Sequence, residues 1–196
     1  VRYRELGLQI EQPISCVLPK KALGLLKNAL PQDGLIDFEF TKSNAFFTFG
    51  NMKLVCRLID ERFPDYENII PLDNNKKVIV GKLEALQVLR RISIFANKNT
   101  NMIRLKLEKD VCTFSAEDVD FSNEANEALD VSYTGEPIEL GFSSKMLLEI
   151  LANIPDENVI IRIKDANKAV LIEPRIQESD SNLLVLAMPV MLGGRY

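Results

Sequence analysis

The strongest constraint on the fold is a pattern that recurs about every 60 residues along the chain. Each time, a short apolar strand ends at Val17, Val80 or Leu140, and a helix follows at once. The predicted helices cover residues 19–30, 82–96 and 143–154. A unit with one helix and several strands is too long for a solenoid repeat. The pattern therefore predicts duplicated half-domains that pair into larger domains.

Alternating strands are predicted after each helix. Ile103, Leu105 and Leu107 alternate with charged residues, and Ile36, Phe38 and Phe40 alternate with polar ones; Ile161 and Ile163 continue the same pattern. Alternation with a period of two indicates antiparallel strands with one buried face and one solvated face. The predicted fold class is α+β, with the helices on one side of antiparallel sheets.

The repeat also predicts domain boundaries. Residues 78–196 contain two units and are expected to form one complete domain. Residues 1–70 contain one unit and are expected to be the second half of another domain, so the chain is expected to be a fragment. The polar, proline-led stretch of residues 71–77 is the expected linker.

Composition excludes several functional classes. The chain has no histidine, which removes His-based triads and the commonest zinc ligand. Cys16, Cys56 and Cys112 are isolated, which indicates a reducing compartment without disulfides. No apolar stretch reaches the ~20 residues of a membrane helix, and no secretion signal is visible. We expect no metal, no cofactor and no membrane partner.

Charge is divided unevenly along the chain. The three predicted helices together carry a net charge of +5. The whole chain carries −4, so the residues outside these helices carry −9. On the first helix, Lys20, Lys21 and Lys27 fall within an arc of about 120°, opposite its leucines. The second helix carries Lys82, Arg90 and Arg91. A basic helical face on an acidic protein can attract phosphate locally, although an ordinary solvated face would look the same.

One apolar residue of the second helix is predicted to point outward. Ala85, Val88, Leu89, Ile92 and Phe95 cluster on one face by helical spacing, whereas Ile94 projects ~160° away from it. An outward isoleucine is either an isolated surface residue or part of a subunit contact.

Candidate catalytic groups are few. Asp60, Glu61 and Asp65 cluster together, and paired carboxylates can act as general acid and base. Arg62 lies among them, so a charged turn with internal ion pairs is the competing interpretation. We therefore expect no catalytic residues. A carboxylate-dependent hydrolase and an interaction module unrelated to DNA remain as alternatives.

Four segments carry a resemblance to one family. They are RLIDERFPDYENIIP, ISIFANKNTNMIRLKLEKD, EALDVSYTGEPIELGF and the terminal LLVLAMPVML. In order and spacing they resemble the bacterial sliding clamp, the beta subunit of DNA polymerase III, over essentially all 196 residues. The resemblance implies the DNA-clamp fold and the role of a processivity factor. It implies a homodimeric ring that encircles duplex DNA, contacts phosphates without reading sequence, and works in the cytoplasm at the nucleoid.

The resemblance also implies particular site residues. The six basic residues above would line the DNA channel, and Ile94, Phe95, Glu124 and Glu127 would lie at the subunit contact. Short peptides of the replicative polymerase, the clamp loader and repair polymerases would bind between the second and third domains. By motif, the peptide-binding positions are Pro64, Asn68, Ile69, Thr100, Ser143, Met146, Asn167, Ala169, Leu186, Ala187, Met188, Pro189, Val190 and Met191.

The sequence departs from the family at several of these positions. Members often have arginine at Asn68 and Met191 and an aromatic residue at Met146, so a more apolar site with a shifted peptide preference is expected. Residues 193–196 extend past the usual chain end, and the family's threonine–aspartate–glycine–histidine loop would precede Val1. The methionines near the chain end supply the adaptable apolar surface that suits several ligands.

Overall fold

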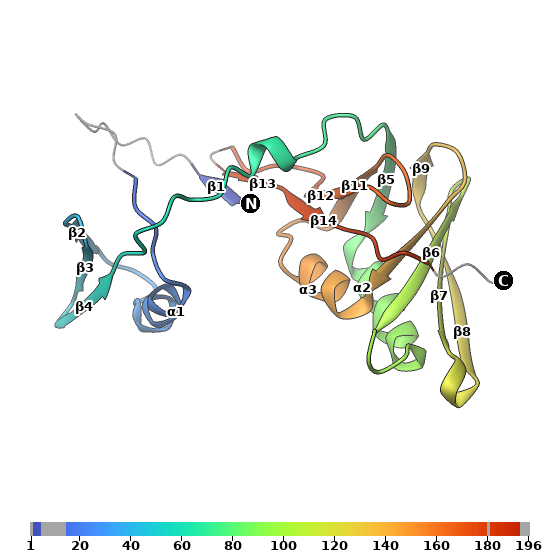
Figure 1. Ribbon diagram of the computed structural model, residues 1–196, viewed down its shortest axis with the longest axis horizontal. Coiled ribbons are helices and arrows are strands. Elements are labelled where there is room, and N and C mark those ends of the chain that lie inside the picture. The colour runs from blue at the N-terminus through green and yellow to red at the C-terminus, as the bar shows by residue number, and fades with distance from the viewer. Residues whose placement is uncertain (1, 5–14, 180, 193–196) are drawn as a thin grey trace. The chain divides into compact units, whose positions relative to one another are not determined.

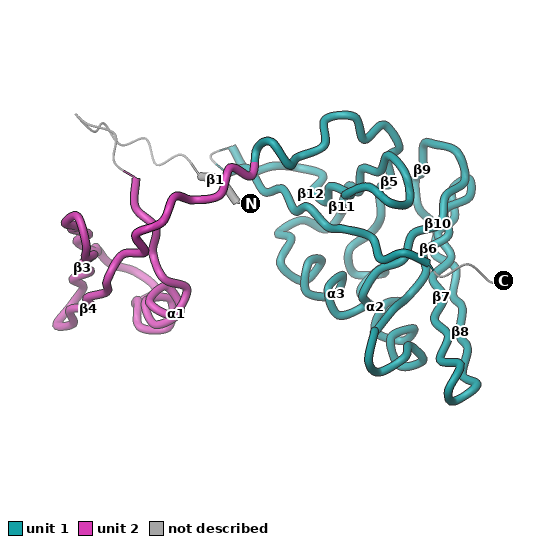
Figure 2. Tube along the Cα trace, in the orientation of Figure 1, with its two compact units in different colours: residues 1–7, 67–196 teal, residues 8–66 magenta. Residues whose placement is uncertain are grey.

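The computed structural model describes residues 2–4, 15–179 and 181–192. The extension at residues 193–196 and most of the first twelve residues therefore lie outside the described residues. The chain divides into two compact units (Figure 2). Unit 1 comprises Val1–Gly7 and Glu67–Tyr196, and unit 2 comprises Leu8–Tyr66. The division falls before residues 71–77.

The described residues of unit 2 form one helix and a small antiparallel sheet with the order β2-β3-β4. Its elements are α1 (Lys20–Ala29), β2 (Asp37–Phe40), β3 (Asn44–Phe49) and β4 (Met52–Arg57). The predicted helix is confirmed to within a residue at each end. An isolated bridge between Val17 and Ile59 ties the segment before α1 to the segment after β4.

The predicted apolar faces of unit 2 are only partly buried. Ala22 is buried, but Leu23 of the same helix face is 45% exposed, and Phe38 on the alternating strand is also 45% exposed. The prediction of one buried face was wrong for β2. Among the described residues, the fully buried apolar cluster of this unit consists of Ala45, Phe47 and Phe49. Phe38 instead stacks on Phe47, with ring centroids 4.8 Å apart.

The described residues of unit 1 form two larger antiparallel sheets and two α-helices, with short 3-10 helices between them (Figure 1). One sheet has the order β10-β6-β7-β8, and the other has the order β14-β12-β11-β5-β9. The first half of the unit comprises η1 (Glu67–Ile69), β5 (Lys76–Gly81), α2 (Lys82–Ile92), η2 (Ser93–Phe95), β6 (Met102–Glu108), β7 (Val111–Asp118), η3 (Val119–Phe121), β8 (Asn123–Asp130) and β9 (Ser132–Thr134). The second half comprises β10 (Ile138–Ser143), α3 (Ser144–Ala152), β11 (Asn158–Ile163), β12 (Val170–Pro174), β13 (Ser181–Leu183) and β14 (Val185–Ala187). A further strand, β1 (Arg2–Arg4), pairs with β13.

The two halves of unit 1 exchange their first strands. β5 pairs with β11 of the second half, and β10 pairs with β6 of the first half. The helix starts are held in the same reciprocal way. The backbone N–H of Lys82 donates to the Glu157 carbonyl at 2.8 Å, and that of Ser144 donates to the Asn101 carbonyl at 2.8 Å. Each half therefore contributes a strand and a helix-start hydrogen bond to the other.

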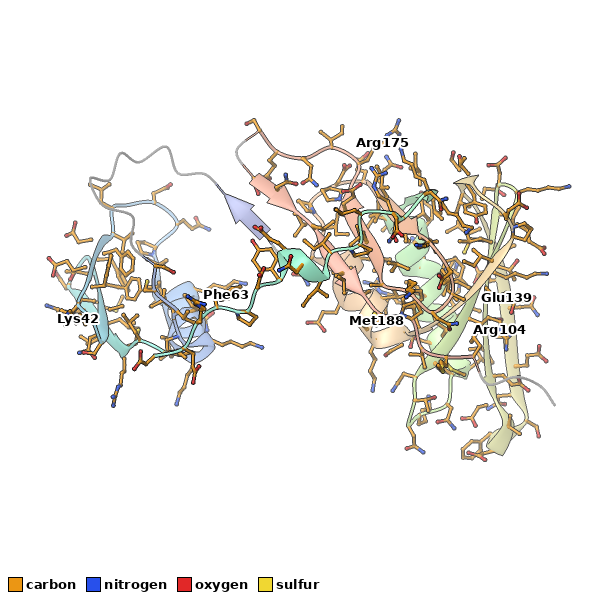
Figure 3. All side chains as sticks on the ribbon, turned by 45° about the horizontal axis from the view of Figure 1, so that its top comes forward. Lys42, Phe63, Arg104, Glu139, Arg175 and Met188 are labelled. Carbon is orange, nitrogen blue, oxygen red and sulfur yellow. The ribbon has the colours of Figure 1, made fainter. Side chains whose placement is uncertain are left out.

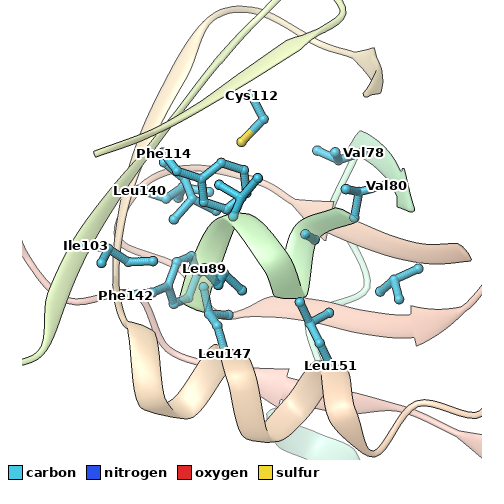
Figure 4. Close-up of a cluster of buried hydrophobic side chains, with 14 of the residues drawn as sticks. Val78, Val80, Leu89, Ile103, Cys112, Phe114, Leu140, Phe142, Leu147 and Leu151 are labelled. Atoms are coloured by element: carbon cyan, nitrogen blue, oxygen red, sulfur yellow. The ribbon is translucent and has the colours of Figure 1, made fainter. Parts of the chain in front are cut away.

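The core of unit 1 lies between its helices and sheets (Figure 4). Leu89 of α2 and Leu147 of α3 are buried together with apolar residues of both sheets, including Ile103, Leu140 and Val159. The predicted core face of α2 is confirmed at Ala85, Val88, Leu89 and Ile92. Phe95 is the exception, because η2 turns it outward and leaves it 38% exposed.

Candidate functional site

The segment after β14 runs from one sheet of unit 1 to the other. β14 pairs with β12, with Ala187 opposite Val170. Three residues later, the backbone N–H of Val190 donates to the Gly141 carbonyl on β10 at 2.8 Å. We name residues 188–192 the strap. Pro189 stands where the strap leaves β14, a position in which its missing N–H costs no sheet hydrogen bond.

The strap forms one wall of a hollow of about 320 Å³, named the strap hollow. Its lining residues are Glu139, Gly141, Ala166, Asn167, Val190, Met191 and Leu192. The structure thus brings together Asn167, Val190 and Met191 of the predicted peptide-binding residues. Met188 and Met191 on the strap are exposed. Among the described lining residues, Glu139 is the one charged group, and it is paired with Arg104 on the neighbouring strand at 2.8 Å (Figure 3).

The hairpin between β11 and β12, which carries Asn167 and Ala169, is held by contacts from residues 73 and 74. The side-chain amide of Asn74 donates to the carbonyls of both Arg162 and Ala169 at 3.0 Å. Lys164 of the hairpin forms an ion pair with Asp73. The hydrogen bond from the Lys164 ammonium to the Asp73 carboxylate lowers the pKa of Asp73 and raises the pKa of Lys164. Residues 73 and 74, inside the expected linker, therefore fasten one wall of the strap hollow.

The remaining predicted peptide-binding residues do not line the strap hollow. Thr100 is exposed in the loop before β6, and Ser143 and Met146 are half-buried at the start of α3. Asn68 and the exposed Ile69 belong to η1. Leu186 is half-buried and Ala187 is buried in β14. Pro64 belongs to unit 2.

The three predicted DNA-binding lysines of unit 2 share one exposed helix face. Lys20, Lys21 and Lys27 are all exposed on α1. Lys27 lies in the last turn, where a cation also stabilises the helix dipole.

The three predicted DNA-binding cations of α2 differ from one another. The ammonium of Lys82 donates to the Ile154 carbonyl, just after α3, at 2.9 Å. Arg91 forms a two-bond ion pair with Glu127 on β8, with N–O distances of 3.0 and 2.5 Å. Arg90 is exposed, and among the described residues it has no ion-pair partner. Two of the three cations therefore have structural partners within the described residues, and Arg90 does not.

The Arg91–Glu127 pair shifts the ionisation of both groups. The hydrogen bond from Arg91, opposed by desolvation, lowers the pKa of Glu127, and the same bond raises the pKa of Arg91. Both side chains therefore stay charged across the physiological range.

The predicted subunit-contact residues lie at one end of α2 and along β8. Ile94 of η2 is 65% exposed, so the predicted outward direction is confirmed. Glu124 is exposed on β8, the outermost strand of its sheet. Glu127 lies on the same strand but is paired with Arg91. Sheet edges of this kind offer backbone groups to another strand.

Sequence reasoning missed two residues near this end. Val119 and Phe121 of η3 are both strongly exposed. Asn97, in the loop after η2, donates to the carboxylates of Asp118 and Asp120 at 3.3 and 3.4 Å, which ties η3 to η2. The sequence signal was two large apolar residues within an acidic run, but single exposed apolar residues are common, so the pattern alone does not mark a contact.

The alternative catalytic cluster lies in unit 2. Asp60 and Glu61 line an open hollow of about 860 Å³ together with Lys42, Arg57 and Arg62, and Asp65 does not line it. Among the described residues, no group of three His, Cys, Asp or Glu side chains could hold a metal ion. Burial raises the pKa of the Cys112 thiol to about 12. No described helix is long and apolar enough to span a membrane.

Comparison with known proteins places this arrangement in a family. Residues 67–190 match the family described as "DNA polymerase III beta subunit, C-terminal domain". The chain belongs to the DNA polymerase III beta subunit family. A relative named beta sliding clamp from Vibrio cholerae is 29% identical over 192 residues, which are 98% of this chain and 51% of the relative. The beta sliding clamp of Haemophilus influenzae is 30% identical over 190 residues, 94% of this chain and 50% of the relative.

Solved structures of beta subunits agree with the fold. The DNA polymerase III subunit beta of Pseudomonas aeruginosa matches with a TM-score of 0.83 and 28% identity, covering 90% of this chain and 48% of that one. A sliding clamp of Bartonella birtlesii bound to griselimycin matches with a TM-score of 0.81 and 29% identity, covering 90% and 47%. The chain spans about half the length of these relatives. The predicted resemblance and clamp fold are confirmed, and the hydrolase alternative is not favoured.

Proposed function

We propose that this chain is the part of a sliding clamp that carries its peptide-docking site, and that the whole protein encircles duplex DNA as a processivity factor of the replicative polymerase. Family membership and the names of the relatives support this role. The observation that carries the docking site is the strap hollow, where Asn167, Val190 and Met191 meet beside the exposed Met188. The protein would act without catalysis or a cofactor, in the cytoplasm at the nucleoid.

The chemistry of the strap hollow suits short apolar peptide segments. Two exposed methionines give a polarizable surface that adapts to different side chains. Among the described lining residues Glu139 is the one acid and there is no cation, and Glu139 is already paired with Arg104, so the described lining favours apolar over acidic ligands. We infer that segments of the polymerase, the clamp loader and repair polymerases dock here through apolar side chains. Griselimycin, which is bound in the clamp crystals of P. aeruginosa and B. birtlesii, is proposed to bind here too.

A matched pair of methionine substitutions tests the docking site. Griselimycin and a labelled peptide of the replicative polymerase are titrated against this chain by calorimetry and fluorescence anisotropy. Met188→Ala and Met191→Ala should each lower the affinity for both ligands about tenfold, the loss typical of truncating a well-packed contact residue. Met52→Ala is the control, because Met52 in unit 2 is 50% exposed and Met188 is 55% exposed. Unchanged affinity in both strap variants would disprove the site.

The proposed contact with DNA is electrostatic. Lys20, Lys21 and Lys27 on α1 and Arg90 on α2 are exposed, whereas most of the acidic charge lies outside the helices. Cations of this kind hold phosphates without reading bases, which suits a protein that must move along DNA. Lys82 and Arg91 would contribute less, because each already has a partner.

The proposed subunit contact uses the end of unit 1 that carries Ile94 and Phe95. These residues and the edge strand β8 would meet the other subunit of a homodimeric ring, with Glu124 at the rim. An apolar centre bordered by charged residues is the usual anatomy of such contacts. Val119 and Phe121 extend the apolar centre and join the proposed contact.

A further inference from the structure

Gly141 lies where the strap meets β10, and a side chain would not fit there. A Cβ atom built on Gly141 would stand 2.5 Å from the Val190 carbonyl oxygen and 2.9 Å from Cδ2 of Leu192. Real Cβ atoms essentially never come closer than 3.0 Å to such neighbours. The first contact is with backbone, which cannot turn aside as a flexible side chain can. Glycine is therefore required by the closeness of the strap.

This contact is the point at which the strap is fixed to β10. The Val190 N–H donates to the Gly141 carbonyl, and these two residues form an isolated antiparallel bridge. On the other side, the strap is attached through β14 to β12. On the β10 side, a single bridge rather than a ladder of hydrogen bonds fixes the strap. Displacing that bridge can therefore move the strap relative to β10, because no neighbouring ladder bonds on that side oppose the shift.

We propose that Gly141 is a positioning residue for the docking site: by lacking a side chain, it lets the strap lie against β10 and so sets where Met188 and Met191 stand. The expected effect on ligand binding rests on the proposed function, whereas the effect on the position of the strap does not. An alanine at 141 requires the distance between its Cβ and the Val190 carbonyl oxygen to grow by at least 0.5 Å, from 2.5 to 3.0 Å, so the strap and β10 must move apart. Binding sites depend on geometry held within ~0.5 Å, so this shift is large enough to matter.

The position of the strap can be read directly from its methionines. The chain contains five methionines, two of them in the strap. With ¹³C-methyl methionine, Gly141→Ala is expected to shift the methyl signals of Met188 and Met191. The signals of Met52 in unit 2 and Met146, which packs against the core of unit 1, should keep their wild-type positions and report an intact fold.

Gly24→Ala is the matched control, because a Cβ at Gly24 on α1 would meet no atom within 4 Å. It should leave all five signals in place. If Gly141→Ala does not fold, Val190→Pro replaces it, because proline removes the N–H of the bridge without adding bulk at Gly141. Strap signals that overlay those of the wild type in the folded variant would overturn the proposal.

Ligand affinity then separates this inference from the proposed function. Griselimycin is expected to bind Gly141→Ala about tenfold more weakly than wild type, while Gly24→Ala binds as wild type. Shifted strap signals with unchanged griselimycin affinity would overturn the positioning role. If wild type itself does not bind griselimycin, the proposed docking of that ligand fails, and the methyl signals still decide whether Gly141 positions the strap.

Discussion

The guanidinium of Arg91 on α2 holds the carboxylate of Glu127 on β8 through two hydrogen bonds, of 3.0 and 2.5 Å. The sequence assigned these residues to different surfaces, Arg91 to DNA and Glu127 to the subunit contact. In the fold they neutralise each other. The pair joins the helix to the edge strand, so it links the two proposed binding surfaces of unit 1.

The pair predicts a pH dependence of stability. Because the folded-state pKa of Glu127 lies below its ordinary value of 4.5, the pair contributes stability at neutral pH and loses it as the pH falls through the lowered pKa. A carboxyl titration by NMR should place the Glu127 pKa below 4.5 in the wild type and return it toward 4.5 in Arg91→Gln. Arg90→Gln is the control, because Arg90 has no ion-pair partner among the described residues, and it should leave the Glu127 titration as in the wild type. A Glu127 pKa indifferent to Arg91 would refute the pair.

The same pair predicts different roles in DNA binding for two adjacent arginines. In the whole protein, Arg90→Gln should reduce the slope of log affinity against log salt concentration by about 0.9, the value for one phosphate contact. Arg91→Gln should reduce it less, because its guanidinium is already occupied by Glu127. Glu127→Gln should instead strengthen binding by releasing Arg91. Equal losses for both arginines would show that the ion pair opens on DNA.

The core of unit 1 gives a prediction of stability with a control on the same helix. Leu89 is 1% exposed, and Leu83 on the same helix is 61% exposed. Leu89→Ala should lower the free energy of unfolding by about 2–5 kcal/mol through lost burial and a cavity. Leu83→Ala should change it by less than about 0.5 kcal/mol. Urea unfolding followed by circular dichroism measures both, and similar losses at the two sites would contradict the described core.

Local sequence patterns predicted the helices and strands well, but they did not predict which distant residues the charged side chains contact. Helical spacing placed α2 and identified Ala85 and Leu89 as core residues, because period and burial are both properties of a short segment. The partners of Lys82 and Arg91 could not be predicted. Ile154 and Glu127 lie far along the chain, so only the packed fold brings them to the helix.

The docking site was predicted from resemblance, but its supports were not. Asn167, Val190 and Met191 were named from the motif, and the structure places them around one hollow. The hydrogen bond from Asn74 to the Ala169 carbonyl of the hairpin could not be predicted, because residues 71–77 have the composition of a polar linker. Gly141 looked like an ordinary strand residue, since the need for glycine arises from the approach of Val190 rather than from its own neighbours in sequence.

Retention on DNA tests the central claim most directly. The whole protein is loaded onto closed circular duplex DNA, washed at high salt to remove purely electrostatic binding, and followed after the circle is cut once. A ring that encircles DNA should remain on the closed circle and leave the linear molecule through its ends. Equal retention on the closed and the cut DNA would contradict the account.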